Sequence, residues 1–217
     1  MATRKKAVYL LALLLFMILP FPAKGEEITI QFFGGFAYNF SLPLVIRQEG
    51  KDNIRLSADY DTKPFDTPIY WSLRAGKWGE KDGWEIELLH HKLYLKNNPP
   101  EVEHFTVTHG FNLLTLNRAW KRANFIWRAG AGVVVAHPES AVRGKTFSQE
   151  GGLFEGYYLA GPTLQVAVEK RFPLFKSFFL CLEGKYTLSW AHIPVEEGKA
   201  DLWNSAIHGL IGLGYNF

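Results

Sequence analysis

Long segments of this chain alternate large apolar residues with small or polar ones, and this period of two limits the fold more than any other feature. In 178–192, one face of the alternation carries Phe178, Leu180, Leu182, Tyr186, Leu188 and Trp190, and the other carries Cys181, Glu183, Lys185, Thr187 and Ser189. Successive side chains of a strand point to opposite faces, so the pattern predicts β-strands with one apolar face. The segments 124–137, 154–172 and 202–217 show the same alternation.

These segments are longer than the usual strand of five or six residues and match the tilted strands of membrane barrels, which have about 10 residues. Their polar faces mix glycine with Glu, Lys, Arg, Gln and Thr, as in 161–171 and 183–187, while their other faces are apolar and aromatic. A membrane barrel would turn the apolar face to lipid, whereas a soluble barrel would turn it inward. Strand length, the 15% aromatic content and the N-terminal segment favour the membrane arrangement. A soluble periplasmic barrel that binds lipid remains an alternative.

The first 25 residues have the organisation of a secretory signal peptide. Arg4, Lys5 and Lys6 precede an apolar run over 7–19, and Ala23 and Gly25 fit a cleavage site before Glu26. Such a run is short of the roughly 20 residues of a transmembrane helix. We therefore predict a cleaved signal over 1–25 and one barrel domain over 26–217.

Cleavage would change the charge balance. Four of the 24 basic residues lie in 1–25, which leaves 20 against 21 acidic residues, a formal charge of −1. This balance gives no electrostatic basis for a nucleic-acid partner. Cys181 is the single cysteine, which excludes an intramolecular disulfide and a thiolate metal cluster. We expect no cofactor.

The last segment, GLIGLGYNF, places Ile211, Leu213, Tyr215 and Phe217 two residues apart. This ending resembles the C-terminal strand of bacterial outer-membrane β-barrels. The resemblance implies that Tyr215 and Phe217 form the signal read by the barrel-assembly machinery. It also implies an integral outer-membrane protein of a Gram-negative envelope, surrounded by outer-membrane lipid and lipopolysaccharide.

We expect an all-β, antiparallel up-and-down transmembrane barrel of 8–10 strands with both termini periplasmic. The candidate strands are 27–40, 42–48, 54–62, 68–78, 83–95, 104–117, 124–137, 154–172, 178–192 and 202–217. The second and third are weak, because 42–48 is short and contains Pro43, and they could instead form a protruding hairpin. The connections alternate between short ones, expected at the periplasmic side, and longer ones near 96–103, 137–152 and 192–201.

A barrel of this size has an interior that side chains nearly fill, so we predict a narrow polar lumen and no general pore. The alternation places seven charged residues on its inner face: Arg74, Glu85, Glu87, Arg128, Glu169, Glu183 and Lys185. Because buried charges need partners, we interpret them as a self-neutralising ion-pair network. A narrow ion path is the alternative, although no residue pattern distinguishes it. The expected role is structural or surface-binding.

The resemblance also allows an enzyme, because some small outer-membrane barrels modify the acyl chains of lipid A. Acyl transfer or hydrolysis needs a base beside a nucleophile, with an acid that orients the base. Hairpin geometry brings His208 close to Ser189, with Glu183 deeper on the same wall. The chain lacks the His-x-Ser pattern of the deacylases and the Asp-Ser pair of the palmitoyltransferase, so this alternative ranks second.

The seven histidines fall in the extracellular half of this topology: His90, His91, His104, His109, His137, His192 and His208. No pair has the i, i+2 spacing that places two ligands on one face of a strand. We therefore predict no metal site. The loop aspartates Asp59, Asp61 and Asp66 would suit Ca²⁺ or a partner, but their spacing demands neither.

Overall fold

The structure is a computed structural model that describes residues 27–148 and 156–217. The predicted signal peptide lies outside the described residues. All the regular structure in the described ranges is β-strand, and none of it is a helix that could cross a membrane.

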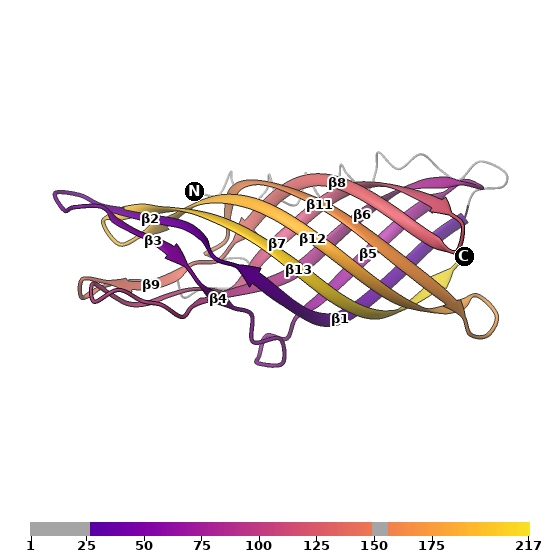
Figure 1. Ribbon diagram of the computed structural model, residues 1–217, viewed down its shortest axis with the longest axis horizontal. Coiled ribbons are helices and arrows are strands. Elements are labelled where there is room, and N and C mark those ends of the chain that lie inside the picture. The colour runs from indigo at the N-terminus through magenta and orange to yellow at the C-terminus, as the bar shows by residue number, and fades with distance from the viewer. Residues whose placement is uncertain (1–26, 149–155) are drawn as a thin grey trace.

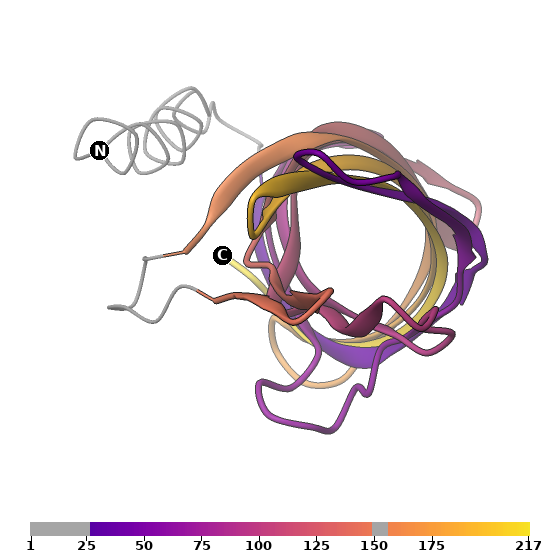
Figure 2. The same ribbon diagram turned by 90° about the vertical axis from the view of Figure 1, so that its left-hand side faces the viewer.

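Eight long strands form the barrel (Figure 1). They are β1 (Glu27–Phe40), β5 (Trp71–Trp78), β6 (Asp82–Leu95), β7 (Val102–Arg122), β8 (Phe125–Ala136), β11 (Tyr158–Pro173), β12 (Phe178–Val195) and β13 (Gly198–Asn216). Each pairs antiparallel with the next one in this order, and β13 pairs with β1 to close the ring (Figure 2). The predicted all-β, antiparallel up-and-down barrel is confirmed, with eight strands.

Five shorter strands extend the sheet beyond one end of the barrel. The hairpin β2 (Leu42–Gln48) and β3 (Ile54–Ala58) attaches to the start of β13, as the alternative of a protruding hairpin predicted. The hairpin β9 (Glu139–Val142) and β10 (Lys145–Phe147) attaches to the start of β7, and β4 (Tyr60–Asp61) attaches to the end of β6. Together with the last residues of β6 and β12 and the first residues of β7 and β13, these strands form what we call the extension. It occupies the left of Figure 1, opposite the C-terminus.

The connections differ between the two ends of the barrel. Short turns at 79–81, 123–124 and 174–177 share one end with the first residues of β1 and the last residues of β13. The other end carries the extension. One connection expected there to be long is tight, because β12 and β13 remain paired up to Val195 and Gly198. Glu197 adopts a positive φ of 54° in the two-residue turn between them.

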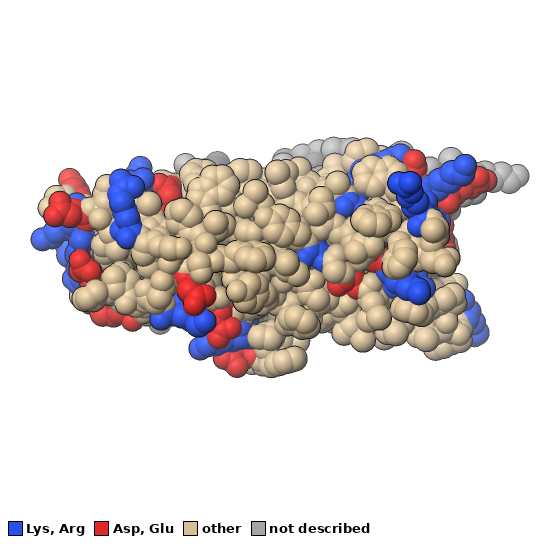
Figure 3. Space-filling view, viewed as in Figure 1, with Lys and Arg blue, Asp and Glu red and all other residues tan. Residues whose placement is uncertain are grey.

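The predicted orientation of the two faces is correct. Outward side chains are apolar and exposed, among them Phe32, Leu73, Leu164, Val166, Ile207, Ile211 and Leu213. Inward side chains at the same levels are polar and buried, such as Thr163, Gln165 and Thr187. In the face shown in Figure 3, the middle of the barrel carries few charged side chains, and most of the charge lies toward the two ends. We call this band of exposed apolar side chains the apolar belt.

One stretch of β11 departs from the predicted alternation. Strict alternation through 154–172 places Leu159 on the polar face with Thr163 and Ala160 on the apolar face with Leu164, but Leu159 is 63% exposed and Ala160 is 4% exposed. The register with β8 shifts between Leu159 and Gly161, which is a β-bulge. A bulge inserts one extra residue, so the face of every residue before it is inverted. Phe154, placed on the apolar face by the same reasoning, lies outside the described residues.

The interior changes character along the barrel axis. Inside the extension it is apolar, with Leu44 and Ile46 of β2 packed in one cluster with Leu93, Phe105 and Ile193. Toward the middle it becomes charged. At the short-turn end, the Phe217 amide donates a hydrogen bond of 2.9 Å to the Ile28 carbonyl, so the last strand is paired through its final residue.

Candidate functional site: a charge cluster in the lumen

All seven charged residues predicted to face the lumen do so, and each is almost completely buried. They come from five strands: Arg74 from β5, Glu85 and Glu87 from β6, Arg128 from β8, Glu169 from β11, and Glu183 and Lys185 from β12. Each lies at an inward position of its strand. The closed barrel therefore brings residues that are far apart in sequence into one cluster, which we call the lumen cluster.

Arg74 lies at the centre of the lumen cluster. Its Nη1 donates to Glu169 Oε2 at 2.9 Å, and its Nη2 donates to Glu183 Oε1 at 2.7 Å and to Glu87 Oε2 at 3.1 Å. Its guanidinium also lies 4.8 Å from the ring centroid of Phe33, a cation–π contact. One arginine thus connects carboxylates from three strands.

Arg128 forms the second centre. It donates to both carboxylate oxygens of Glu85, from Nε at 2.6 Å and from Nη2 at 3.2 Å. Its Nη1 lies 2.5 Å from Glu183 Oε2, and its Nη2 lies 3.0 Å from Glu169 Oε2. Such bidentate, charge-assisted bonds are the strong ones in proteins. Glu183 and Glu169 are consequently shared between both arginines.

Two further cations complete the charge balance. Lys185 pairs with Glu87 and lies 3.2 Å from Glu183. Arg171 Nε lies 2.5 Å from Glu169 Oε1. Four cations thus face four glutamates. Arg171 was not among the residues predicted for the network. Its position two residues after Glu169 indicates that both side chains lie on the inner face of β11.

Neutral side chains take up the remaining carboxylate lone pairs. Ser72 and Gln165 donate to Glu87 at 2.7 and 2.9 Å, and Gln31 donates to Glu169 at 3.0 Å. Buried charges are tolerated where ion pairs and hydrogen bonds replace the lost water. The charges of the lumen cluster are therefore compensated within the lumen, in the manner expected of a self-neutralising network.

The residues proposed for lipid chemistry lie on one wall of the lumen but form separate contacts. His208 is fully buried; its Nδ1 is 2.7 Å from the hydroxyl of Tyr70, and its Nε2 is 2.9 Å from the hydroxyl of Thr187. Ser189 bonds to Thr163 at 2.7 Å, and Glu183 belongs to the lumen cluster. The structure does not bring Ser189, His208 and Glu183 together as a nucleophile, a base and an orienting acid.

The junction between the extension and the barrel carries its own polar contacts. Asp201 of β13 accepts a hydrogen bond of 2.6 Å from His192 Nδ1 and a second from Arg47 of β2. Burial alone would raise the pKa of Asp201, but these hydrogen bonds outweigh it and hold the pKa below its usual value. The carboxylate thus fastens the β2–β3 hairpin to β12 and β13.

The fold and the lumen define a class of protein: a closed, antiparallel, eight-stranded barrel with an apolar exterior and an interior that contains paired charges. No family model matches the chain, and no curated protein matches it. Among solved structures, the chain is similar to the attachment invasion locus protein Ail of Yersinia pestis, with 11% identity over 90% of this chain and 100% of that one, at a TM-score of 0.39. For Ail in complex with the heparin analogue sucrose octasulfate, the identity is 12%, the coverage is 88% and 99%, and the TM-score is 0.41. For Neisserial surface protein A (NspA), the identity is 10%, the coverage is 90% and 99%, and the TM-score is 0.42.

Proposed function

We propose that this chain is an integral outer-membrane protein with a sealed lumen, whose extension presents a surface for structural contacts or binding outside the cell. The observation that carries the proposal is the apolar belt around a charged interior. A soluble barrel would leave this belt in water, and an apolar patch this large is typical of a surface that contacts lipid or protein.

The height of the belt supports insertion in a bilayer. Along β13 the outward side chains from Trp203 to Tyr215 are largely apolar. This stretch spans about 40 Å along the strand, or roughly 28 Å at a tilt of about 45°, which matches a hydrocarbon core of about 30 Å. Aromatic residues lie at both of its ends, as in the girdles of membrane barrels.

The short-turn end would then be periplasmic and the extension extracellular, with both ends of the mature chain on the periplasmic side. Outer-membrane lipid and lipopolysaccharide would surround the belt. The assembly machinery would read the last strand, with Tyr215 and Phe217 as its signal. Since paired charges occupy the lumen and apolar side chains pack inside the extension, a role at the surface fits this architecture better than transport.

The test is cysteine labelling in intact cells with a membrane-impermeant maleimide. Arg55→Cys is in the extension, Asn124→Cys is in a short turn, and Leu164→Cys is in the belt; all three native side chains are exposed. The native chain is the control, because Cys181 is fully buried. We expect Arg55→Cys to react in intact cells, Asn124→Cys to react only once the outer membrane is opened, and Leu164→Cys to react only in detergent.

Equal labelling of the three variants in a soluble periplasmic fraction would overturn the proposal and favour the soluble lipid-binding barrel. Labelling of Asn124→Cys, but not of Arg55→Cys, in intact cells would reverse the proposed orientation and remove the surface role.

A further inference from the structure

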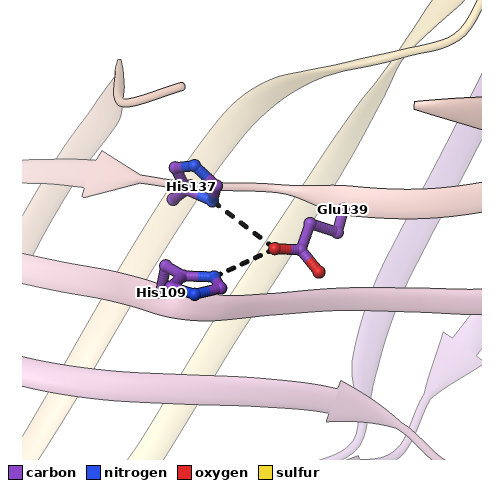
Figure 4. A group of neighbouring side chains, drawn as sticks. All are labelled: His109, His137 and Glu139. Atoms are coloured by element: carbon purple, nitrogen blue, oxygen red, sulfur yellow. Dashed lines mark hydrogen bonds and ion pairs between the residues drawn. The ribbon is translucent and has the colours of Figure 1, made fainter. Parts of the chain in front are cut away.

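Two histidines and a glutamate meet where β7 and β8 leave the barrel and β9 begins. His109 lies on β7, His137 directly follows β8, and Glu139 is the first residue of β9 (Figure 4). His109 Nδ1 is 2.9 Å from Glu139 Oε1, and His137 Nδ1 is 3.8 Å from the same oxygen. A set of possible ligand atoms, one from each residue, lies within 4.8 Å of one another.

Irregular backbone at this junction brings the three side chains together. The pairing of β7 with β8 stops at Phe111 and Ala136, and the pairing of β7 with β9 begins at Thr106 and Glu139. Between them, Gly110 adopts a φ of +132° and its carbonyl accepts a hydrogen bond of 3.0 Å from the His137 amide. His137 and Glu139 are two residues apart in sequence, but His109 lies on another strand, so a search for i, i+2 pairs among the histidines alone could not find the set.

The donor set suits zinc. Imidazole nitrogen and carboxylate oxygen are preferred Zn²⁺ ligands, and two histidines with one glutamate form a known three-ligand set. In a tetrahedral site with bonds of about 2.05 Å, two ligand atoms lie about 3.3 Å apart. The two separations from Glu139 Oε1, 2.9 and 3.8 Å, lie on either side of this value. The ligand atoms of the two histidines lie within 4.8 Å of each other, so binding would require some rotation of these side chains.

The surroundings hold the ligands and leave access from solvent. His137 is buried, whereas the His109 side chain is 58% exposed. Tyr157 donates its hydroxyl hydrogen to the His109 carbonyl at 2.7 Å, and its ring centroid is 5.1 Å from that of His137. Tyr157 thus holds the backbone at His109 and packs against the ring of His137. Three protein ligands leave a fourth position for water.

We propose that His109, His137 and Glu139 bind one divalent zinc ion at the base of the extension. The ion would join β7 to the connection between β8 and β9. It would thereby fasten the β9–β10 hairpin to the barrel. The site does not depend on the membrane orientation proposed above.

The test is zinc binding to the full chain, folded in detergent and carrying no histidine tag. Bound zinc is measured by atomic absorption after equilibrium dialysis against Zn²⁺ alone. The test variants are His109→Ala and Glu139→Gln; the second keeps an oxygen that can accept a hydrogen bond from His109. The matched control is His104→Ala, which removes an exposed histidine from the same strand.

We expect about one zinc per native chain and per His104→Ala chain, since His104 lies outside the donor set. Each test variant should weaken binding by on the order of 100-fold, at least the loss seen when an outer-shell partner is removed. Heat-modifiable migration in gels reports whether each variant folds. Zinc should also slow proteolysis of the β9–β10 hairpin in the native chain but not in Glu139→Gln. Absence of zinc from the native chain, unchanged binding by folded Glu139→Gln, or equal loss in His104→Ala would each overturn the proposal.

Discussion

Arg74 is the residue on which the lumen cluster depends most. It contacts Glu87, Glu169 and Glu183 directly, and Glu85 lies 3.8 Å from its Nε. Because the side chains in this layer are removed from water, loss of the guanidinium would leave carboxylates without compensation. Removal of one partner of a buried ion pair costs about 3–5 kcal/mol, whereas removal of the pair costs far less.

Arg74→Gln should therefore lower the free energy of unfolding by about 3–5 kcal/mol, measured by urea titration of the barrel in lipid vesicles. The control is Arg118→Gln, which breaks a partly exposed pair with Asp82 at 2.7 Å and should change stability by less than about 1 kcal/mol. Arg74→Gln combined with Glu183→Gln should recover part of the loss. Equal stability of Arg74→Gln and Arg118→Gln would show that the cluster is hydrated.

At the residue scale, the sequence predicted which charges face the lumen but not how they pair. Period two places Arg74, Arg128 and Glu183 on the inner face, and this required only local information. The sharing of Glu183 by both arginines depends on the closure and stagger of the barrel, which no local pattern contains. His208 shows the same limit: its inward direction was predictable, but its partner Tyr70 comes from the connection before β5, and its contact with Thr187 depends on the register of the β12–β13 hairpin.

At the scale of elements, the bulge in β11 shows where alternation stops being informative. Ala160 is the extra residue, and Gly161 next to it approaches β12 closely: a Cβ at Gly161 would lie 2.3 Å from the Trp190 carbonyl oxygen. Because glycine has no Cβ, β11 can lie this close to β12 at the bulge. The sequence contains this glycine but nothing that separates it from the glycines of the polar face.

Gly161→Ala should destabilise the barrel by about 1–3 kcal/mol, because the added methyl group forces β11 and β12 apart. Gly184→Ala on β12 is the matched control, since a Cβ there meets no atom within 4 Å. Urea unfolding in vesicles measures both variants against the native chain. A loss of stability no greater in Gly161→Ala than in Gly184→Ala would contradict the close approach at the bulge.

The extension illustrates a second limit at this scale. The segment 42–48 was weak as a barrel strand because it is short and contains Pro43, and these features are compatible with β2, which pairs with only part of β13. The segment 192–201 contains proline, glycine and charged residues, a composition that predicts a long connection. Pairing with β2 and packing of Ile193 and Val195 in the apolar interior keep it in the sheet. Tertiary contacts override local composition here.

At the scale of the whole molecule, two kinds of side chain occupy the lumen in series. The compensated charges of the lumen cluster lie in the middle of the barrel, and apolar side chains such as Leu44, Phe105 and Ile193 pack inside the extension. Eight strands leave an interior that side chains can fill. An ion crossing the barrel would have to pass the ion pairs of Arg74 and Arg128 and then the largely apolar interior of the extension.

We therefore expect no steady ion conductance when the folded chain is inserted in a planar lipid bilayer, at salt concentrations where a general porin shows stepwise currents. The bilayer must contain inserted protein, which proteolysis of the extension from one side can verify. The matched comparison is Arg74→Gln combined with Glu183→Gln, which loosens the lumen cluster but leaves the apolar layer in place and should also remain closed. Regular current steps from the native chain would show that the lumen cluster is a path for ions. Steps from the double variant alone would show that this cluster, without help from the extension, is what seals the barrel.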